Sequence, residues 1–166
     1  MSLERLIEGL ADAGVAFVVV GMVAGQLYGS RVATYDLDVV YDTNEENVTR
    51  VSEYLLGLDP YVKETWPNEG VASDFTRSVL MSERSLSIGT TEGEIDLLHR
   101  IDGIGEYTSA LAQSTPFVLG NGKEIRVLTL TALIAAKRAS NREKDRLHII
   151  ELEAIAELER KRRSES

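Results

Sequence analysis

Two aspartates that stand one residue apart in an apolar stretch are the side chains in this chain best suited to chemistry. Asp36 and Asp38 alternate with Leu37, Val39 and Val40. Residues i and i+2 of a strand project to the same face of a sheet, so both carboxylates would point to one side. Adjacent buried carboxylates raise each other's pKa unless a cation lies between them. The pair therefore indicates a site for a divalent metal ion.

A third aspartate, Asp96, lies in the apolar stretch Glu94–Leu98. If that stretch forms a strand beside residues 35–41, Asp96 completes a carboxylate triad. Hard oxygen ligands suit Mg²⁺, and Mn²⁺ accepts the same ligands. Three carboxylates can hold two such ions about 3.5–4 Å apart, the arrangement used for in-line phosphoryl or nucleotidyl displacement. The alternative is that the aspartates are ordinary solvent-facing residues at strand ends.

Three residues on the N-terminal side of the aspartates are candidates for contact with phosphate. Gly21 follows the apolar run Val15–Val20 and opens a helical segment, whose first main-chain amides would favour an anion. Arg31 would hold a phosphate through two parallel hydrogen bonds. Thr34 immediately precedes the acidic stretch. The structural alternatives are a turn glycine, a surface ion pair and a β-forming residue at the start of a strand.

Composition and charge exclude several classes of site. The chain has 166 residues, no cysteine and a formal net charge of -9, so thiolate metal sites and cysteine nucleophiles are excluded and a broad nucleic-acid surface is disfavoured. Residues 137–163 nevertheless hold 9 basic against 6 acidic side chains, which predicts a solvated basic helix or a surface facing phosphates. With no leader pattern and no apolar run of about 18 residues, we expect a cytoplasmic protein without a membrane partner.

Hydrophobic periodicity predicts the elements that would position these residues. Gly14 would end the first helix, and Thr43-Asn44-Glu45-Glu46 reads as a capping box that starts another. The expected helices cover residues 2–13, 22–30, 44–57, 145–160 and a segment from 129 onward, and the expected strands cover 15–20, 35–41, 79–88, 94–99, 117–119 and 125–128. This order predicts an α/β or α+β fold with a mixed β-sheet flanked by helices and a C-terminal helical pair.

Short motifs occur in a fixed order along the chain: Gly21-Met22, Arg31-x-x-Thr34, Asp36-Leu37-Asp38, Ile95-Asp96-Leu97, Leu133-Ile134-Ala135-Ala136-Lys137 and Arg142-Glu143-Lys144-Asp145. In this order and spacing they resemble the nucleotidyltransferase superfamily. The C-terminal motifs resemble one branch of it, the nucleotidyltransferase-like toxins of type IV toxin–antitoxin (abortive-infection) systems and related uncharacterised bacterial nucleotidyltransferases. The resemblance implies the nucleotidyltransferase fold, with a core over residues 1–128 and C-terminal helices over 129–166 packed on the same domain.

The resemblance also implies roles for individual residues. Asp36, Asp38 and Asp96 would be catalytic and would bind Mg²⁺ or Mn²⁺, with Asp96 acting as metal ligand or base. The residues that would contact the nucleotide are Gly21, Met22, Arg31, Thr34, Lys137 and Asp145. The family usually has Gly or Ser where this chain has Met22, so phosphate binding there would rest on main-chain amides. Asp145 at the start of a helix also fits an N-cap.

The expected function is metal-dependent transfer of a nucleoside monophosphate from an NTP to a hydroxyl acceptor. A tRNA, a protein and a small molecule such as an antibiotic all remain open as the acceptor. An antitoxin protein is an expected partner if the chain is a toxin. The alternatives are a non-catalytic nucleotide-binding or interaction module of the same fold and a phosphotransferase that uses the same site.

Overall fold

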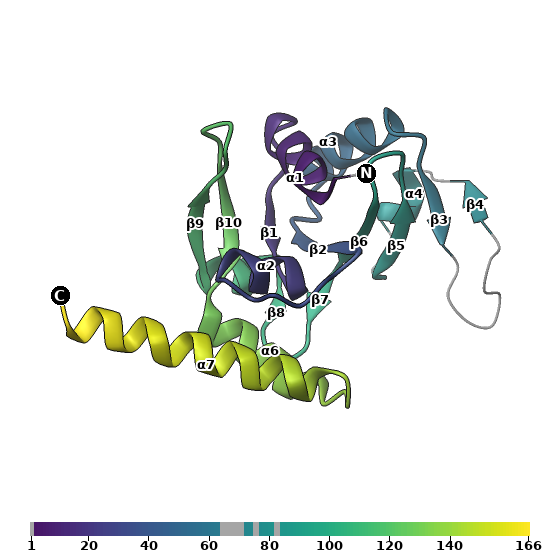
Figure 1. The fold of residues 1–166 in the computed structure, drawn as a ribbon. Helices are drawn as coiled ribbons and strands as arrows, with labels where there is room; N and C mark the ends of the chain where they lie inside the picture. The colour runs from purple at the N-terminus through teal and green to yellow at the C-terminus, as the bar shows by residue number, and fades with distance from the viewer. Residues whose placement is uncertain (1, 64–71, 75–76, 82–83) are drawn as a thin grey trace.

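The computed structural model describes residues 2–63, 72–74, 77–81 and 84–166. Within these ranges eight strands form one mixed sheet in the order β4-β3-β5-β6-β2-β1-β10-β9, and β7 and β8 form a small separate pair (Figure 1). The strands are β1 Phe17–Val19, β2 Asp36–Tyr41, β3 Tyr61–Lys63, β4 Ala72–Asp74, β5 Leu86–Gly89, β6 Glu94–Leu98, β7 Arg100–Ile101, β8 Gly105–Glu106, β9 Ser114–Val118 and β10 Glu124–Leu128. The helices are α1 Leu3–Asp12, α2 Gly21–Leu27, α3 Glu45–Leu56, α4 Arg77–Leu80, α5 Tyr107–Ala112, α6 Leu130–Ser140 and α7 Asp145–Ser164.

The centre of the sheet sets the register of the acidic strands. β2 pairs antiparallel with β1 and parallel with β6. In the parallel pair, Asp36 lies opposite Glu94 and Asp38 lies opposite Asp96. Paired residues of neighbouring strands project to the same face, so this register brings Asp96 beside Asp38.

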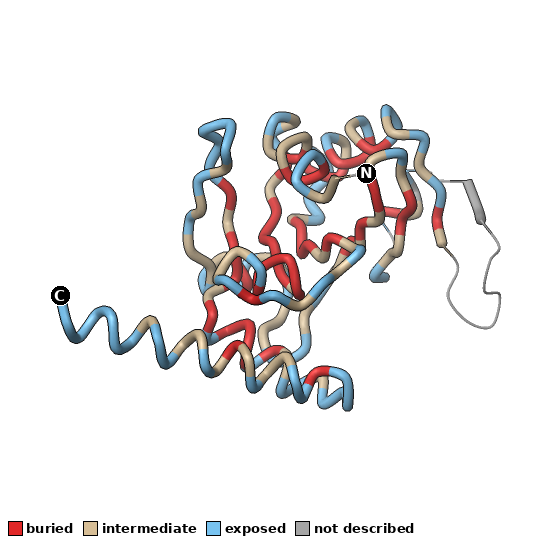
Figure 2. Tube along the Cα trace, in the orientation of Figure 1, coloured by how far each residue is buried: buried red, intermediate tan, exposed pale blue. Residues whose placement is uncertain are grey.

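The hydrophobic core lies along the central strands and the helices that cover them. Figure 2 shows the buried residues of these elements in red. Leu37 and Val39 of β2 are fully buried on the face opposite to the aspartates. Asn47 of α3 is also buried, and its amide bonds both the N–H and the carbonyl of Ala16 and the carbonyl of Asp42. These bonds fasten α3 to the chain at the start of β1 and the end of β2.

The C-terminal helices lie on one side of the molecule, at the bottom of the view in Figure 1. α6 packs against both α2 and α7. The Thr129 side chain caps α6 by accepting a hydrogen bond from the main-chain N–H of Ala132. Leu152, fully buried, anchors α7 in the hydrophobic core. No helix in the described ranges is both long enough and apolar enough to cross a bilayer.

The structure confirms the mixed sheet with flanking helices and corrects two local predictions. Residues 79–88 do not form one strand, because Val79 and Leu80 belong to α4 and β5 begins only at Leu86. Periodicity cannot separate a short apolar strand from a buried helical turn, and here Leu80 is buried and its carbonyl accepts the Tyr41 hydroxyl. The capping box at Thr43 is also wrong: Asn44 caps α3, since its side chain accepts from the N–H of Asn47.

Candidate functional site

The three aspartates meet at one point on the sheet. Asp36 and Asp38 of β2 and Asp96 of β6 each offer a carboxylate oxygen, and these three oxygens lie within 4.8 Å of one another. Thr34 Oγ1 donates to Asp36 Oδ1 over 2.7 Å, and Ser87 Oγ of β5 donates to Asp96 Oδ1 over 2.6 Å. Two hydroxyls therefore orient the outer carboxylates of the triad, while Asp38 lies between them.

The triad concentrates negative charge in a partly buried place. Burial raises the pKa of Asp38 to about 7, with further contributions from Asp36 and Asp96 that Lys137 and Lys144 partly oppose. Burial also raises the pKa of Asp96, although the hydrogen bond from Ser87 acts against it. Carboxylates that repel one another in this way bind a divalent cation well, because the cation relieves the repulsion. The donor set therefore fits a divalent cation that prefers oxygen ligands.

A cleft of about 690 Å³ opens over the triad, and it collects residues from distant parts of the chain. The N-terminal part contributes Gly21, Met22 and the segment 33–36, and the sheet contributes Asp38 and Asp96. The opposite wall comes from α6, α7 and the loop between them, through Lys137, Ser140, Arg142, Lys144, Asp145 and His148. A wall with several cations thus faces a floor of three carboxylates.

Arg31 is the one predicted site residue that does not line this cleft. It is exposed, and its main-chain N–H donates to Glu151 Oε1 of α7 over 3.0 Å. The other predicted residues, Gly21, Met22, Thr34, Asp36, Asp38, Asp96, Lys137 and Asp145, all line it. Their proximity does not establish their roles, which remain predictions.

Gly21 approaches the triad more closely than any side chain would permit. Its φ is +63°, a left-handed conformation that glycine adopts without strain. A Cβ placed on it would lie 2.7 Å from Asp38 Cγ and 2.9 Å from Asp38 Cβ, well inside van der Waals contact. The glycine is therefore needed for packing beside Asp38.

Lys137 and Asp145 form a buried ion pair at the C-terminal wall. Their side chains are 12% and 8% exposed, and Lys137 Nζ lies 3.1 Å from Asp145 Oδ1. Burial alone would raise the pKa of Asp145, but hydrogen bonds from Ser140 and Lys137 outweigh it and lower the pKa below its usual value. The N-cap of α7 is Lys144, so the prediction that Asp145 caps this helix is wrong. Asp145 instead holds Lys137 at the edge of the cleft.

Replacing Lys137 by methionine should destabilise the protein by about 3–5 kcal/mol, because it leaves the Asp145 carboxylate buried without its cation. Equilibrium urea denaturation of wild type and K137M measures this loss. The matched control is Arg138→Met, one residue along α6, where the pair with Glu153 is 63% and 42% exposed. We expect that change to cost less than about 1 kcal/mol. Equal losses in the two variants would contradict a structural role for the buried pair.

Some residues of the cleft were not predicted as site residues from the sequence. Arg142 and Lys144 belong to a motif that carries the family resemblance, so a sequence signal for them existed. Both are exposed, line the cleft and form no ion pair with a described residue. Ser87 does not line the cleft but bonds Asp96, and it gave no such signal, because only the β5–β6 register places it opposite Asp96. His148 also lines the cleft, and its buried Nδ1 has no hydrogen-bond partner among the described residues.

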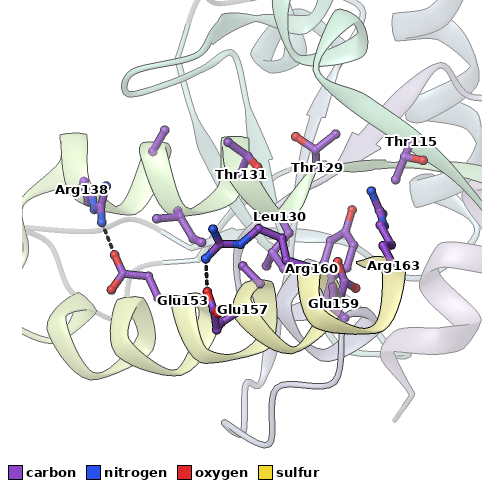
Figure 3. Close-up of a pocket in the computed structure, with 14 residues that line it drawn as sticks. Thr115, Thr129, Leu130, Thr131, Arg138, Glu153, Glu157, Glu159, Arg160 and Arg163 are labelled. Atoms are coloured by element: carbon purple, nitrogen blue, oxygen red, sulfur yellow. Dashed lines mark hydrogen bonds and ion pairs between the residues drawn. The ribbon is translucent and has the colours of Figure 1, made fainter. Parts of the chain in front are cut away.

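A larger cavity of about 960 Å³ lies between α6, α7 and Thr115 of β9 (Figure 3). Several of its charged groups pair with one another, as Arg138 does with Glu153 and Arg160 with Glu157. Tyr28 also lines this cavity, and its hydroxyl donates to the carbonyl of Leu128 over 3.0 Å. Among the described residues, a cluster of three carboxylates that could hold a metal ion lies in the smaller cleft and not in this cavity, so the smaller cleft is the better candidate for a reaction site.

Comparisons with known proteins support the fold. No protein-family model matches the chain. No curated protein matches it either. The structure is similar to the crystal structure of a Thermotoga maritima protein described as "a putative nucleotidyltransferase", with a TM-score of 0.50 and 20% sequence identity. The match covers 100% of this chain and 97% of that one. At this identity the similarity shows the fold alone, which is the nucleotidyltransferase-like α+β architecture expected above.

Proposed function

We propose that the protein is a metal-dependent nucleotidyltransferase that moves a nucleoside monophosphate from an NTP to a hydroxyl acceptor. The observation that carries this proposal is the carboxylate triad on β2 and β6, facing a cationic wall across one cleft. In this reaction the acceptor oxygen bonds to the α-phosphorus, the bond from that phosphorus to the pyrophosphate oxygen breaks, and pyrophosphate leaves. A carboxylate of the triad takes the proton of the acceptor hydroxyl.

The residues on the floor of the cleft and those on its cationic wall would have different roles in this reaction. Asp36, Asp38 and Asp96 would hold Mg²⁺ or Mn²⁺. When bound, the ion supplies charge neutralisation at the phosphate oxygens and lowers the pKa of an attacking hydroxyl. Lys137, with its ammonium group held by Asp145, would face the phosphates as a preorganised cation. Thr34 would keep the Asp36 carboxylate oriented.

The loop between α6 and α7 would contribute to triphosphate binding. Arg142 and Lys144 are exposed on the cleft wall and form no ion pair with a described residue, so they are available to neutralise phosphate oxygens. Both lie in the segment 137–163, which carries more basic than acidic side chains in an otherwise acidic chain. We further propose a cytoplasmic location, and an antitoxin partner if the protein is a toxin.

The proposal is tested by incubating the protein with each NTP labelled at the α-phosphate, together with Mg²⁺ or Mn²⁺ and one class of acceptor at a time. The acceptors are a tRNA pool, a protein pool and small polyhydroxylated antibiotics. We expect label in one class of acceptor and an equal amount of pyrophosphate, both lost in the presence of a chelator. Transfer of label from γ-labelled NTP would instead show a phosphotransferase. Binding of Mg²⁺–NTP without turnover across all acceptors would favour a non-catalytic nucleotide-binding module.

A further inference from the structure

The most exposed large hydrophobic side chain in the described ranges lies on the wall of the candidate site. Tyr35 is 85% exposed and lines the cleft beside Asp36. The other exposed large hydrophobic residues lie outside that lining; they are Leu56, Tyr61, Met81, Val118, Leu147, Ile150 and Leu158. Within the described part of the chain, Tyr35 is thus the one exposed large hydrophobic residue that lines the cleft.

The main chain that carries Tyr35 is held firmly on both sides. Gln26 Nε2 of α2 donates to the carbonyl of Val32 over 2.8 Å. Ser30 Oγ donates to Glu151 Oε2 of α7 over 2.6 Å, and Thr34 Oγ1 is bonded to Asp36. The ring itself makes no hydrogen bond, ion pair or ring contact with another described residue. The ring is therefore exposed on a segment that hydrogen bonds tie to α2, α7 and β2.

An exposed ring on a fixed backbone is suited to stacking. Tyrosine supplies a large flat apolar face at a small cost in conformational entropy, since it has only two side-chain torsions. The same cleft contains cations for phosphate groups and carboxylates for metal ions. The chemical class that combines a polyphosphate, a bound cation and a flat aromatic ring is the nucleotide.

We propose that Tyr35 stacks on the nucleobase of the donor nucleotide and thereby serves as a binding residue of the site. This inference rests on the proposed function and adds to it the place where the base binds. Stacking does not read hydrogen-bonding groups, because every base has a π-face. We therefore expect Tyr35 to strengthen binding of all four NTPs by similar factors.

The test compares ligands with and without a base, by calorimetric titration in the presence of Mg²⁺. The probes are ATP, UTP, inorganic tripolyphosphate and a short single-stranded RNA. We expect Tyr35→Ala to weaken ATP and UTP binding about 10-fold or more, the usual size of one lost stacking contact. Tyr35→Phe should retain the affinity of wild type. Tripolyphosphate should bind all these proteins equally, which a merely structural role of Tyr35 would not produce.

Tyr61→Ala is the matched control, because Tyr61 is exposed on β3 but does not line the cleft. Unchanged ATP affinity in Y35A, or an equal loss for ATP and tripolyphosphate, would overturn the inference. A loss confined to RNA would also overturn it, because the stacked base would then belong to the acceptor. Failure of wild type to bind either ATP or tripolyphosphate would instead overturn the proposed function itself.

Discussion

Asp38→Asn should lower nucleotidyl transfer by about 10³-fold or more while making the metal-free protein more stable at pH 8. The loss of transfer follows because the central carboxylate of the triad no longer binds the cation, whose effect on the reaction is worth several kcal/mol. The gain in stability follows because asparagine removes a partly buried negative charge that repels Asp36 and Asp96. A residue that costs stability and supports activity is typical of a functional site.

The pH dependence gives this prediction a definite sign. Burial and the two neighbouring carboxylates raise the pKa of Asp38 to about 7 in the folded protein, from its ordinary value of 3.8. Between these two values the folded state binds more protons than the unfolded state, so the free energy of unfolding falls as the pH rises. We therefore expect the metal-free wild type to lose stability between about pH 4 and pH 7. Above that range, the Asp38 carboxyl should change the free energy of unfolding little.

Urea denaturation at pH 5 and pH 8 with a chelator, for wild type and D38N, measures this difference. Between pH 5 and pH 8 the free energy of unfolding should fall less in D38N than in wild type. At pH 8, Mg²⁺ should stabilise only the wild type. Asp102→Asn is the control, because Asp102 is an exposed residue of the same cleft outside the triad. If D38N proves less stable than wild type without metal, or transfers nucleotide at the wild-type rate, the assignment of Asp38 is wrong.

Gly21→Ala should abolish metal binding and nucleotidyl transfer, although this substitution removes no polar group. A Cβ at this position would overlap the Asp38 side chain, so the carboxylate must move out of the triad. The left-handed backbone adds a penalty of about 1–2 kcal/mol for any side chain at this position. Calorimetric titration with Mg²⁺ and the labelled-NTP assay measure the two losses.

Gly14→Ala separates the steric effect from the backbone effect. Gly14 has a φ of +70°, close to that of Gly21, and a Cβ there would meet nothing within 4 Å. We expect G14A to lose a similar amount of stability from backbone strain and to keep metal binding and transfer. Normal metal binding in G21A would show that the contact between Gly21 and Asp38 does not position the carboxylate.

Much of the fold could be predicted because its elements are marked by local patterns. The apolar run Val15–Val20 contains β1, and the apolar-acidic alternation from Asp36 onward forms β2. The expected strands over 117–119 and 125–128 lie in β9 and β10, which pair antiparallel across Gly120-Asn121-Gly122. The predicted helices over 2–13, 44–57 and 145–160 correspond to α1, α3 and α7, with ends that differ by a few residues.

The errors occurred where a local pattern permits more than one structure. Val79 and Leu80 are apolar neighbours that suit a strand or a buried helical turn, and in the structure they form the turn, where Leu80 is buried and its carbonyl accepts the Tyr41 hydroxyl. Thr43 and Asn44 both suit an N-cap, and the bond from Asn47 selected Asn44. Asp145 suits a cap equally well, but Lys137 and Ser140 reach its carboxylate from α6.

By itself, the sequence determined which side chains of this protein are suited to phosphate and metal chemistry. Alternation in a strand puts Asp36 and Asp38 on one face whatever lies around them. Only the tertiary structure decided that Asp96 joins them, because the parallel β2–β6 register is a pairing between separate segments. It also decided that the loop between α6 and α7 faces this triad and that Arg31 lies outside the cleft. Side-chain direction within a strand is a local property, whereas the distance between segments depends on how the whole core packs.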